Sequence, residues 1–333
     1  MEVGLPAGVT TGVGSLPHRD ARSAADFVLS ALPELPAIPS LPNRTPAEGM
    51  LAQAAVGIRG VSIAPDGDLL VDPRRVDPLV TIAADLDHDA FGGLLAFLEA
   101  AAGRQGPVKW QLTGPITLGL ALCRKGVPAS SAFEVAVRAV RVHLRAVHKA
   151  VTQALPACPQ VVVLDEPGLT SLLRPDFPLA ADSAIDLVSG ALAAVEATAM
   201  VGVHHCGDGD LAAILATGPA ILSLPVCPGL VGVAGYLGSF LDAGGWIAWG
   251  AVPTDRPVGT GADRYWHELA ELWCDMVRAG CSPVRLREQS VITPACGLAL
   301  HSEDQAAREL RLVAEVAGRV RAQAVATKLS IGA

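Results

Sequence analysis

An apolar run that ends in reactive side chains stands in the second half of the chain, Ala199-Met200-Val201-Gly202-Val203-His204-His205-Cys206-Gly207. Such a run before a glycine predicts a buried strand that leads through a turn into a helix. The run Ser290–Ala295 ends in the same way, at Cys296-Gly297. If the two strands end at one rim of a sheet, one imidazole and two thiolates meet there. This ligand set suits zinc, with one coordination position left open as in catalytic sites.

Short runs of the same kind alternate with Ala-rich helical segments along the whole chain, which is the pattern of a parallel α/β sheet. The expected strands are Gly8–Ser15, Leu35–Leu41, Pro107–Thr113, Gln160–Asp165, Ala199–His204, Ala220–Val226, Trp246–Val252 and Ser290–Ala295. The clearest helices are expected at Ser131–Leu155, Ala181–Thr198, Ala262–Ala279 and Ser302–Val325. Eight strands in 333 residues predict a single (β/α)8 TIM-type barrel that forms one domain over 1–333.

A small insertion is expected after the second strand. Two short β-like runs, Val61–Ile63 and Leu69–Val71, flank the turn Pro65-Asp66-Gly67-Asp68 and predict a hairpin. The following stretch, Leu79–Ala101, reads as helical, with Gly92-Gly93 as a break.

An open doubly wound sheet is the alternative fold. It requires a glycine-rich phosphate loop after the first strand. The segment there, Gly12-Val13-Gly14-Ser15-Leu16-Pro17, has Pro17 where the third glycine belongs. The barrel is therefore preferred.

Composition narrows the class of protein. The formal net charge is -8, and no cluster of Lys and Arg interleaved with aromatic residues is present, which argues against a nucleic-acid partner. Charged residues, Gly or Pro interrupt every apolar stretch before it reaches membrane-spanning length. The N-terminus does not read as a signal peptide, so a cytoplasmic location is expected. The seven cysteines are then expected to be thiols or metal ligands rather than disulfides.

Five motifs together resemble the catalytic half of cobalamin-independent methionine synthase, in the same order and with similar spacing. They are Thr11–Pro17, Leu112–Pro115, Leu164–Leu169, His204-x-Cys206 and Pro294–Leu298, and they span nearly the whole chain. The resemblance implies a zinc-dependent methyltransferase barrel that methylates the sulfur of homocysteine. The additional N-terminal barrel of the full-length enzymes is not expected here.

The resemblance also implies roles for individual residues. His204, Cys206 and Cys296 correspond to zinc ligands, and Asp165 to the carboxylate that holds the amino group of the substrate. Ser15, with the backbone around Gly14, corresponds to the cradle for the substrate carboxylate.

Two positions depart from the family pattern. The family has a carboxylate zinc ligand at the end of the sixth strand, where this chain has Pro225; Cys227 is the candidate substitute, and three protein ligands are the alternative. The family has an acidic residue at the end of the second strand, where this chain has Asn43-Arg44. A basic side chain there suits a carboxylate, sulfonate or phosphate better than an ammonium group.

Other candidate residues have two interpretations each. Thr113 is a substrate-binding residue or a turn former, and His18 is a proton carrier near the rim or a helix cap. The methyl donor is expected to be a methyl-folate, a methylcorrinoid, on a corrinoid protein or free, or a small methylated compound. Competing functions are a corrinoid-linked thiol methyltransferase, a metal-free decarboxylase of the uroporphyrinogen-decarboxylase type, and a non-catalytic zinc or thiol-metabolite binding protein.

Overall fold

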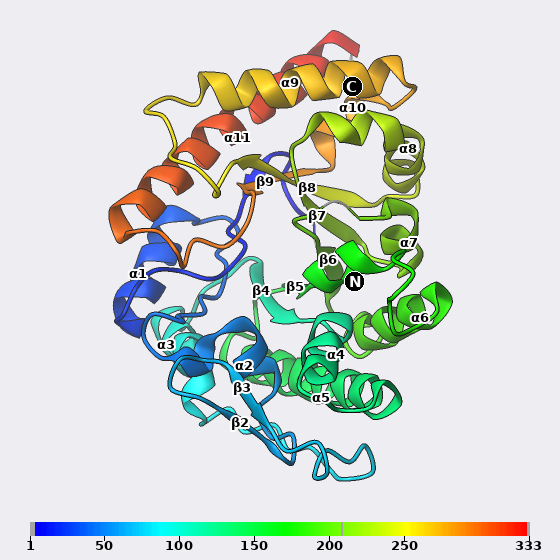
Figure 1. Cartoon of the computed structure of the whole chain (residues 1–333). Coiled ribbons are helices and arrows are strands. Elements are labelled where there is room, and N and C mark those ends of the chain that lie inside the picture. The colour runs from blue at the N-terminus through cyan, green and yellow to red at the C-terminus, as the bar shows by residue number, and fades with distance from the viewer. Residues whose placement is uncertain (1–3, 208, 332–333) are drawn as a thin grey trace.

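The computed structural model describes residues 4–207 and 209–331 and shows a curled, fully parallel sheet with helices around its outer face (Figure 1). Seven strands lie in the order β1-β9-β8-β7-β6-β5-β4. Their bounds are β1 Val9–Thr10, β4 Val108–Thr113, β5 Gln160–Asp165, β6 Met200–His204, β7 Ile221–Pro225, β8 Trp246–Val252 and β9 Ser290–Pro294. The expected α/β class and parallel sheet are confirmed, with seven regular strands in place of eight.

The eighth expected strand, Leu35–Leu41, makes only isolated bridges. Ser40 pairs with Ser15 on the side of β1, and Ala37 pairs with Lys109 of β4. The segment therefore lies between the two edge strands of the sheet. Pro36 and Pro39 have no backbone N–H to donate, so a continuous ladder cannot form along this segment.

The helices follow the strands, as the βα pattern predicts. They are α1 Ala21–Ala31, α2 Met50–Ala54, α3 Gly92–Ala100, α4 Pro115–Arg124, α5 Ala129–Ala154, α6 Ala181–Leu192, α7 Leu211–Ala216, α8 Ala234–Asp242, α9 Asp263–Arg278, α10 Pro283–Glu288 and α11 Glu303–Ile331. Short 3-10 turns are η1 Pro46–Glu48, η2 Asp89–Phe91, η3 Pro167–Ser171 and η4 Pro228–Val233. The helix expected over 181–198 ends six residues early, at Leu192.

The insertion has the predicted hairpin but not the predicted long helix. β2 Val61–Ile63 pairs antiparallel with β3 Leu69–Val71, within the expected bounds. Residues 79–88 are not helical, because Asp77 and Asp85 accept hydrogen bonds from backbone N–H groups two residues on and form turns. The helical part of the expected stretch begins only at Asp89.

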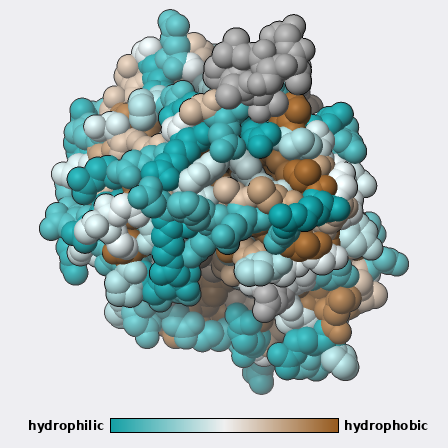
Figure 2. Space-filling model, turned by 90° about the horizontal axis from the view of Figure 1, so that it is seen from above, coloured by the Kyte–Doolittle hydropathy of each residue, from teal (hydrophilic) through white to brown (hydrophobic). Residues whose placement is uncertain are grey.

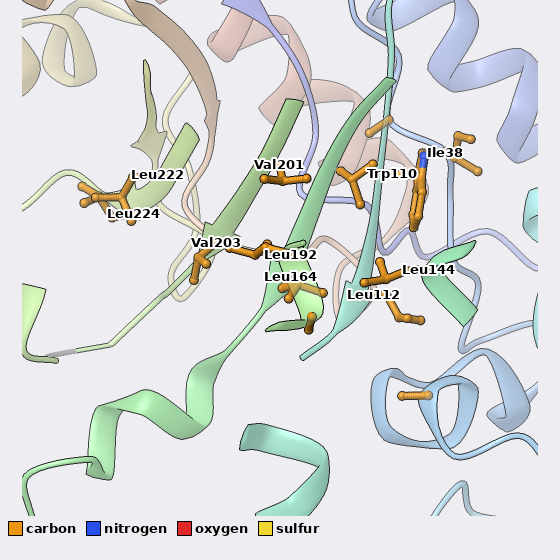
Figure 3. Close-up of a cluster of buried hydrophobic side chains, with 14 of the residues drawn as sticks. Ile38, Trp110, Leu112, Leu144, Leu164, Leu192, Val201, Val203, Leu222 and Leu224 are labelled. Carbon is orange, nitrogen blue, oxygen red and sulfur yellow. The ribbon is translucent and has the colours of Figure 1, made fainter. Parts of the chain in front are cut away.

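Apolar side chains fill both faces of the sheet. On the outer face, Leu112, Leu164, Val203 and Leu222 point toward the helices, where Leu144 and Leu192 meet them (Figure 3). On the inner face a smaller cluster fills the centre; its members include Val161, Val163, Met200, Ile221, Ala248 and Val291. The sheet is thus packed with apolar side chains on both sides.

The outer surface is mixed in character. Seen from above, hydrophilic residues predominate and hydrophobic ones are scattered between them (Figure 2). Within residues 4–207 and 209–331, no helix is both long enough and apolar enough to cross a membrane.

Replacing His143 with phenylalanine is expected to make the fold more resistant to acid. His143 lies on α5, fully buried beside the ring of Phe91, and burial lowers its pKa from 6.5 to about 4. The folded protein therefore keeps the ring neutral where the unfolded chain protonates it. This contribution to stability is complete above pH 6.5 and is lost as the pH falls toward 4, by about 3 kcal/mol.

Urea unfolding of wild type and His143→Phe at pH 7 and pH 4 measures this difference. The variant should lose less free energy of unfolding between the two pH values than wild type does. Equal losses in the two proteins would show that His143 does not contribute to the acid sensitivity.

Candidate metal centre at the rim of the sheet

Two strand ends that are not neighbours in the sheet supply a three-residue cluster. His204 is the last residue of β6, Cys206 follows it, and Cys296 follows β9. One ligand atom from each, the imidazole nitrogen and the two Sγ atoms, lies within 4.8 Å of the others. Because β7 and β8 separate β6 from β9, the curl of the sheet is what brings these atoms together.

His204 is oriented for coordination through one nitrogen. Its ring is buried, and Nδ1 lies 2.9 Å from Oγ of Ser223 on β7. Nε2 is buried and has no hydrogen-bond partner among the described residues. If Nδ1 carries the proton and donates it to Ser223, Nε2 presents a lone pair toward the cluster. A partner of this kind on the second ring nitrogen is typical of metal-bound histidines.

The two thiols interact directly. A hydrogen bond from Cys296 lowers the pKa of Cys206 to about 7, and the same contact raises the pKa of Cys296 to about 12. One thiol of the pair therefore ionises more readily than an isolated cysteine, because the other thiol donates a hydrogen bond to its thiolate. Two close sulfurs and an imidazole form a soft donor set of the kind that zinc prefers.

The proposed fourth ligand lies outside this group. Among the described residues the cluster has three members, and Cys227 is not one of them. Cys227 lines a neighbouring groove of about 870 Å³, which Cys206 also lines. Pro225, at the end of β7, faces the same side of its strand as Ser223, and it supplies no ligand atom. The potential ligand atoms thus form a group of three among the described residues.

Asp165 ends β5 and is paired in register with His204. Its Oδ1 atom is buried and has no hydrogen-bond partner within the described chain. Burial raises the pKa of Asp165, while the neighbouring His204 and Lys109 oppose that rise. A carboxylate with an unsatisfied oxygen beside the cluster is placed to accept hydrogen bonds from a cationic group of a ligand.

The Glu166 side chain, which follows β5, faces away from the cluster and makes no ion pair with any described residue. Its carboxylate accepts hydrogen bonds from the backbone N–H groups of Ile116 and Thr117, both at 2.8 Å, at the first turn of α4. Burial raises its pKa to about 7, and these bonds oppose the rise. Gly114 makes this possible, because a Cβ there would lie 2.2 Å from the Glu166 carboxylate. The N-terminus of α4 thus takes the place of a cationic partner for this buried carboxylate.

The bend at Gly14 and Ser15 lies beside the loop that carries Cys296. The Ser15 carbonyl accepts a hydrogen bond of 2.9 Å from the N–H of Leu298, and a Cβ at Gly297 would lie 2.1 Å from the Ser15 hydroxyl oxygen. Gly14 has a φ of +144°, which side-chain-bearing residues rarely adopt. The bend and the candidate metal ligand Cys296 are therefore held together.

The two ambiguous polar residues lie in different settings. The hydroxyl of Thr113 donates to the Met50 carbonyl at 2.7 Å, although its backbone pairs with Asp165. His18 stacks on Phe27, its Nε2 lies 4.0 Å from a Glu303 oxygen, and burial lowers its pKa. The cap of α1 is Asp20, not His18. The cluster of ligand atoms includes neither Thr113 nor His18.

Arg44 is engaged by two carboxylates. Its Nε atom lies 2.6 Å from Glu48, which is buried, and its Nη1 atom lies 2.8 Å from Asp89. Its positive charge is thus balanced within the protein. Its guanidinium group is therefore already occupied, which leaves it less available to bind an acid group of a substrate. The basic residue at this position thus gives a weaker argument against an acceptor with an ammonium group than the sequence alone indicates.

Three polar residues of the inner face were not singled out from the sequence. They are Lys109 and Gln111 of β4 and Ser223 of β7. A signal was present: positions 109, 111 and 113 are polar and alternate with Trp110 and Leu112. Alternation of this kind in a buried strand marks a polar inner face.

The folds of two solved proteins are similar to this one. A B12-independent methionine synthase from Shewanella sp. W3-18-1, in complex with selenomethionine, has a TM-score of 0.63 and 15% identity, covering 96% of this chain and 99% of that chain. A candidate vitamin-B12-independent methionine synthase from Listeria monocytogenes has a TM-score of 0.58 and 15% identity, covering 95% of this chain and 98% of that chain. No protein-family model and no curated protein matches the sequence. The resemblance expected from the five motifs is confirmed at the level of the fold.

Proposed function

We propose that this protein is a zinc-dependent methyltransferase that transfers a methyl group to the sulfur of a small thiol, with homocysteine as the acceptor and methionine as the product. The observation that supports this best is the convergence of His204, Cys206 and Cys296 within 4.8 Å. The structural likeness to two proteins described as B12-independent methionine synthases supports the same proposal. The five sequence motifs support it as well, because they contain the three potential ligands.

In this proposal His204, Cys206 and Cys296 hold the ion. Zinc bound there would lower the pKa of a coordinated thiol and keep its sulfur available as a thiolate at neutral pH. The acceptor sulfur then forms a bond to the methyl carbon as the bond from that carbon to the donor atom breaks. The leaving donor atom keeps the electron pair, and the thiol proton goes to solvent.

The other site residues bind the remainder of the acceptor. Asp165 accepts hydrogen bonds from the ammonium group, and the bend at Gly14 and Ser15 receives the carboxylate. The charge of Arg44 is balanced by Glu48 and Asp89, so it would not repel the ammonium group of an amino acid. An amino acid therefore remains our proposed acceptor. Methyl-folate and a methylcorrinoid, free or on a carrier protein, are the donors to be compared.

We also propose that the chain folds as one eight-stranded barrel domain. Its segment 36–40 would occupy the eighth strand position, since it bridges to both edges of the seven-stranded sheet.

Elemental analysis of the purified protein, combined with a product assay, tests the function. One zinc per chain and formation of methionine from homocysteine with at least one donor are expected. Zinc without transfer from any donor would favour a binding protein, and an active metal-free protein would favour a decarboxylase. Either result would overturn the proposal.

Replacing Ser223 with alanine is expected to weaken zinc binding without abolishing it. The variant removes the hydroxyl 2.9 Å from Nδ1 of His204 and leaves the three ligands in place. Loss of such a partner costs about 10–100-fold in metal affinity. Competition with a chromophoric chelator measures the change, and Ser239→Ala on the exterior helix α8 serves as the control. An unchanged affinity in Ser223→Ala would show that Ser223 does not orient the imidazole.

A further inference from the structure

A buried lysine lies on the inner face of β4, below the candidate site. Lys109 is 4% exposed, and its ammonium group donates hydrogen bonds to the Val13 carbonyl and to Oε1 of Gln111, the latter at 2.8 Å. Val13 directly precedes the bend at Gly14 and Ser15. Lys109 therefore connects β4 to the segment proposed to bind the acid group of the acceptor.

The contact with Lys109 fixes which way the Gln111 amide points. An ammonium group can only donate, so the amide oxygen is the end that faces Lys109, and the NH2 end points the other way. The whole amide lies against Gly14, where an added Cβ would be 1.7 Å from Nε2 and 2.2 Å from Oε1. Its hydrogen bond to the Ile38 carbonyl is long, at 3.5 Å, and engages only one of its two N–H groups.

The register of the sheet puts Gln111 on the same inner face as Asp165. Gln111 pairs with Val163, and Thr113 pairs with Asp165, so Gln111 and Asp165 are diagonal neighbours, two residues apart along adjacent strands. Hydrogen-bond donors backed by a cation and a carboxylate thus share one face of the site. An α-amino acid presents the complementary pair, a carboxylate and an ammonium group on one carbon.

We propose that Gln111 is a specificity-determining residue that donates hydrogen bonds to the carboxylate of the thiol acceptor, and that Lys109 is the positioning residue that holds its amide in this orientation. The inference rests on the proposed function and deepens it. Simple thiols that lack an acid group should bind through sulfur and Asp165 alone.

Three thiols separate the two ends of the site. Homocysteine has both polar groups, 3-aminopropanethiol lacks the acid group, and 4-mercaptobutyrate lacks the amino group. The dissociation constant of each is measured from the sulfur-to-cobalt absorption band of the cobalt-substituted protein. Gln111→Leu should raise the dissociation constants of homocysteine and 4-mercaptobutyrate by about tenfold or more. The dissociation constant of 3-aminopropanethiol should stay within about twofold of its wild-type value, because that thiol has no carboxylate that could accept a hydrogen bond from Gln111.

Gln111→Glu gives an independent test in the same assay. A carboxylate at this position repels the acid group, so the preference should shift further toward 3-aminopropanethiol than in Gln111→Leu. Lys109→Met should raise the dissociation constant of homocysteine more than that of 3-aminopropanethiol, but by less than Gln111→Leu does. The Gln111 amide remains in this variant, and only the contact that fixes its orientation is lost. Gln53→Leu, whose amide binds the Ala90 carbonyl on the outer part of the fold, is the matched control.

The outcomes separate the inference from the proposed function. If wild type gives no sulfur-to-cobalt band with homocysteine, the proposed function is wrong. If wild type gives the band but Gln111→Leu weakens all three thiols equally, or none of them, only the role of Gln111 is wrong. If Lys109→Met folds and binds all three thiols as wild type does, the positioning role of Lys109 is wrong.

Discussion

Cys296→Ser is expected to leave the protein without stoichiometric zinc and without methyl transfer. A serine hydroxyl stays protonated near neutral pH and is a poor ligand for zinc, so only His204 and Cys206 would remain. Cys296 is also the only member of the cluster that comes from the far side of the sheet, after β9. Two ligands that lie two residues apart do not make a site that retains the ion through purification.

Cys206→Ser should give the same result for the same reason. Cys274→Ser, on the exposed face of α9, is the matched control and should keep full zinc and activity. Elemental analysis of the three purified variants, with circular dichroism to confirm the fold, makes the measurement. Full zinc in both site variants would remove the basis of the proposed function.

Asp165→Asn is expected to lower kcat/KM for homocysteine by about 10–150-fold, the equivalent of losing one charged hydrogen bond of about 1.5–3 kcal/mol. The substitution keeps the size of the side chain but removes the negative charge that would hold the ammonium group. Zinc content should stay at the wild-type level, because Asp165 is not part of the ligand cluster.

An acceptor without an amino group, 4-mercaptobutyrate, distinguishes the loss of ammonium binding from a general loss of activity. With 4-mercaptobutyrate, Asp165→Asn should act as wild type does. Asp176→Asn, whose carboxylate is exposed beside Arg174, is the matched control. An equal loss with both acceptors would mean that Asp165 supports the structure of the site rather than the amino group.

Much of the fold could be predicted because strong local signals coincide with the final elements. The runs at Gln160–Asp165 and Trp246–Val252 are strands with the expected bounds, since both are apolar and end at a turn. The predictions were wrong where backbone hydrogen bonds are diverted. Prolines interrupt the ladder at 36 and 39, and the side chains of Asp77 and Asp85 form turns in 79–88, where a helix was expected.

The convergence of His204, Cys206 and Cys296 could be predicted because each follows a strand, and parallel strands end at one rim. The environment of the cluster could not. The partner of His204 on β7 and the contact of Lys109 with Val13 depend on register and on the curl of the sheet. The ion pairs of Arg44 with Glu48 and Asp89 could not be predicted either, because they depend on the packing of η1 against η2.

The proline-bearing segment between β1 and β4 has a mechanical consequence. Within the part of the chain that the structure describes, two backbone hydrogen bonds join each of its sides to the sheet. The N–H groups of Ile38 and Lys109 donate on the side of β4, and those of Leu16 and Ser40 donate on the side of β1. The neighbouring junction of β1 with β9 has two register pairs, whereas the other junctions of the sheet have three to six. The sheet is therefore joined by few backbone hydrogen bonds on this side. Since the Gly14 bend borders the proline-bearing segment, a small separation there would widen the entrance for an incoming molecule.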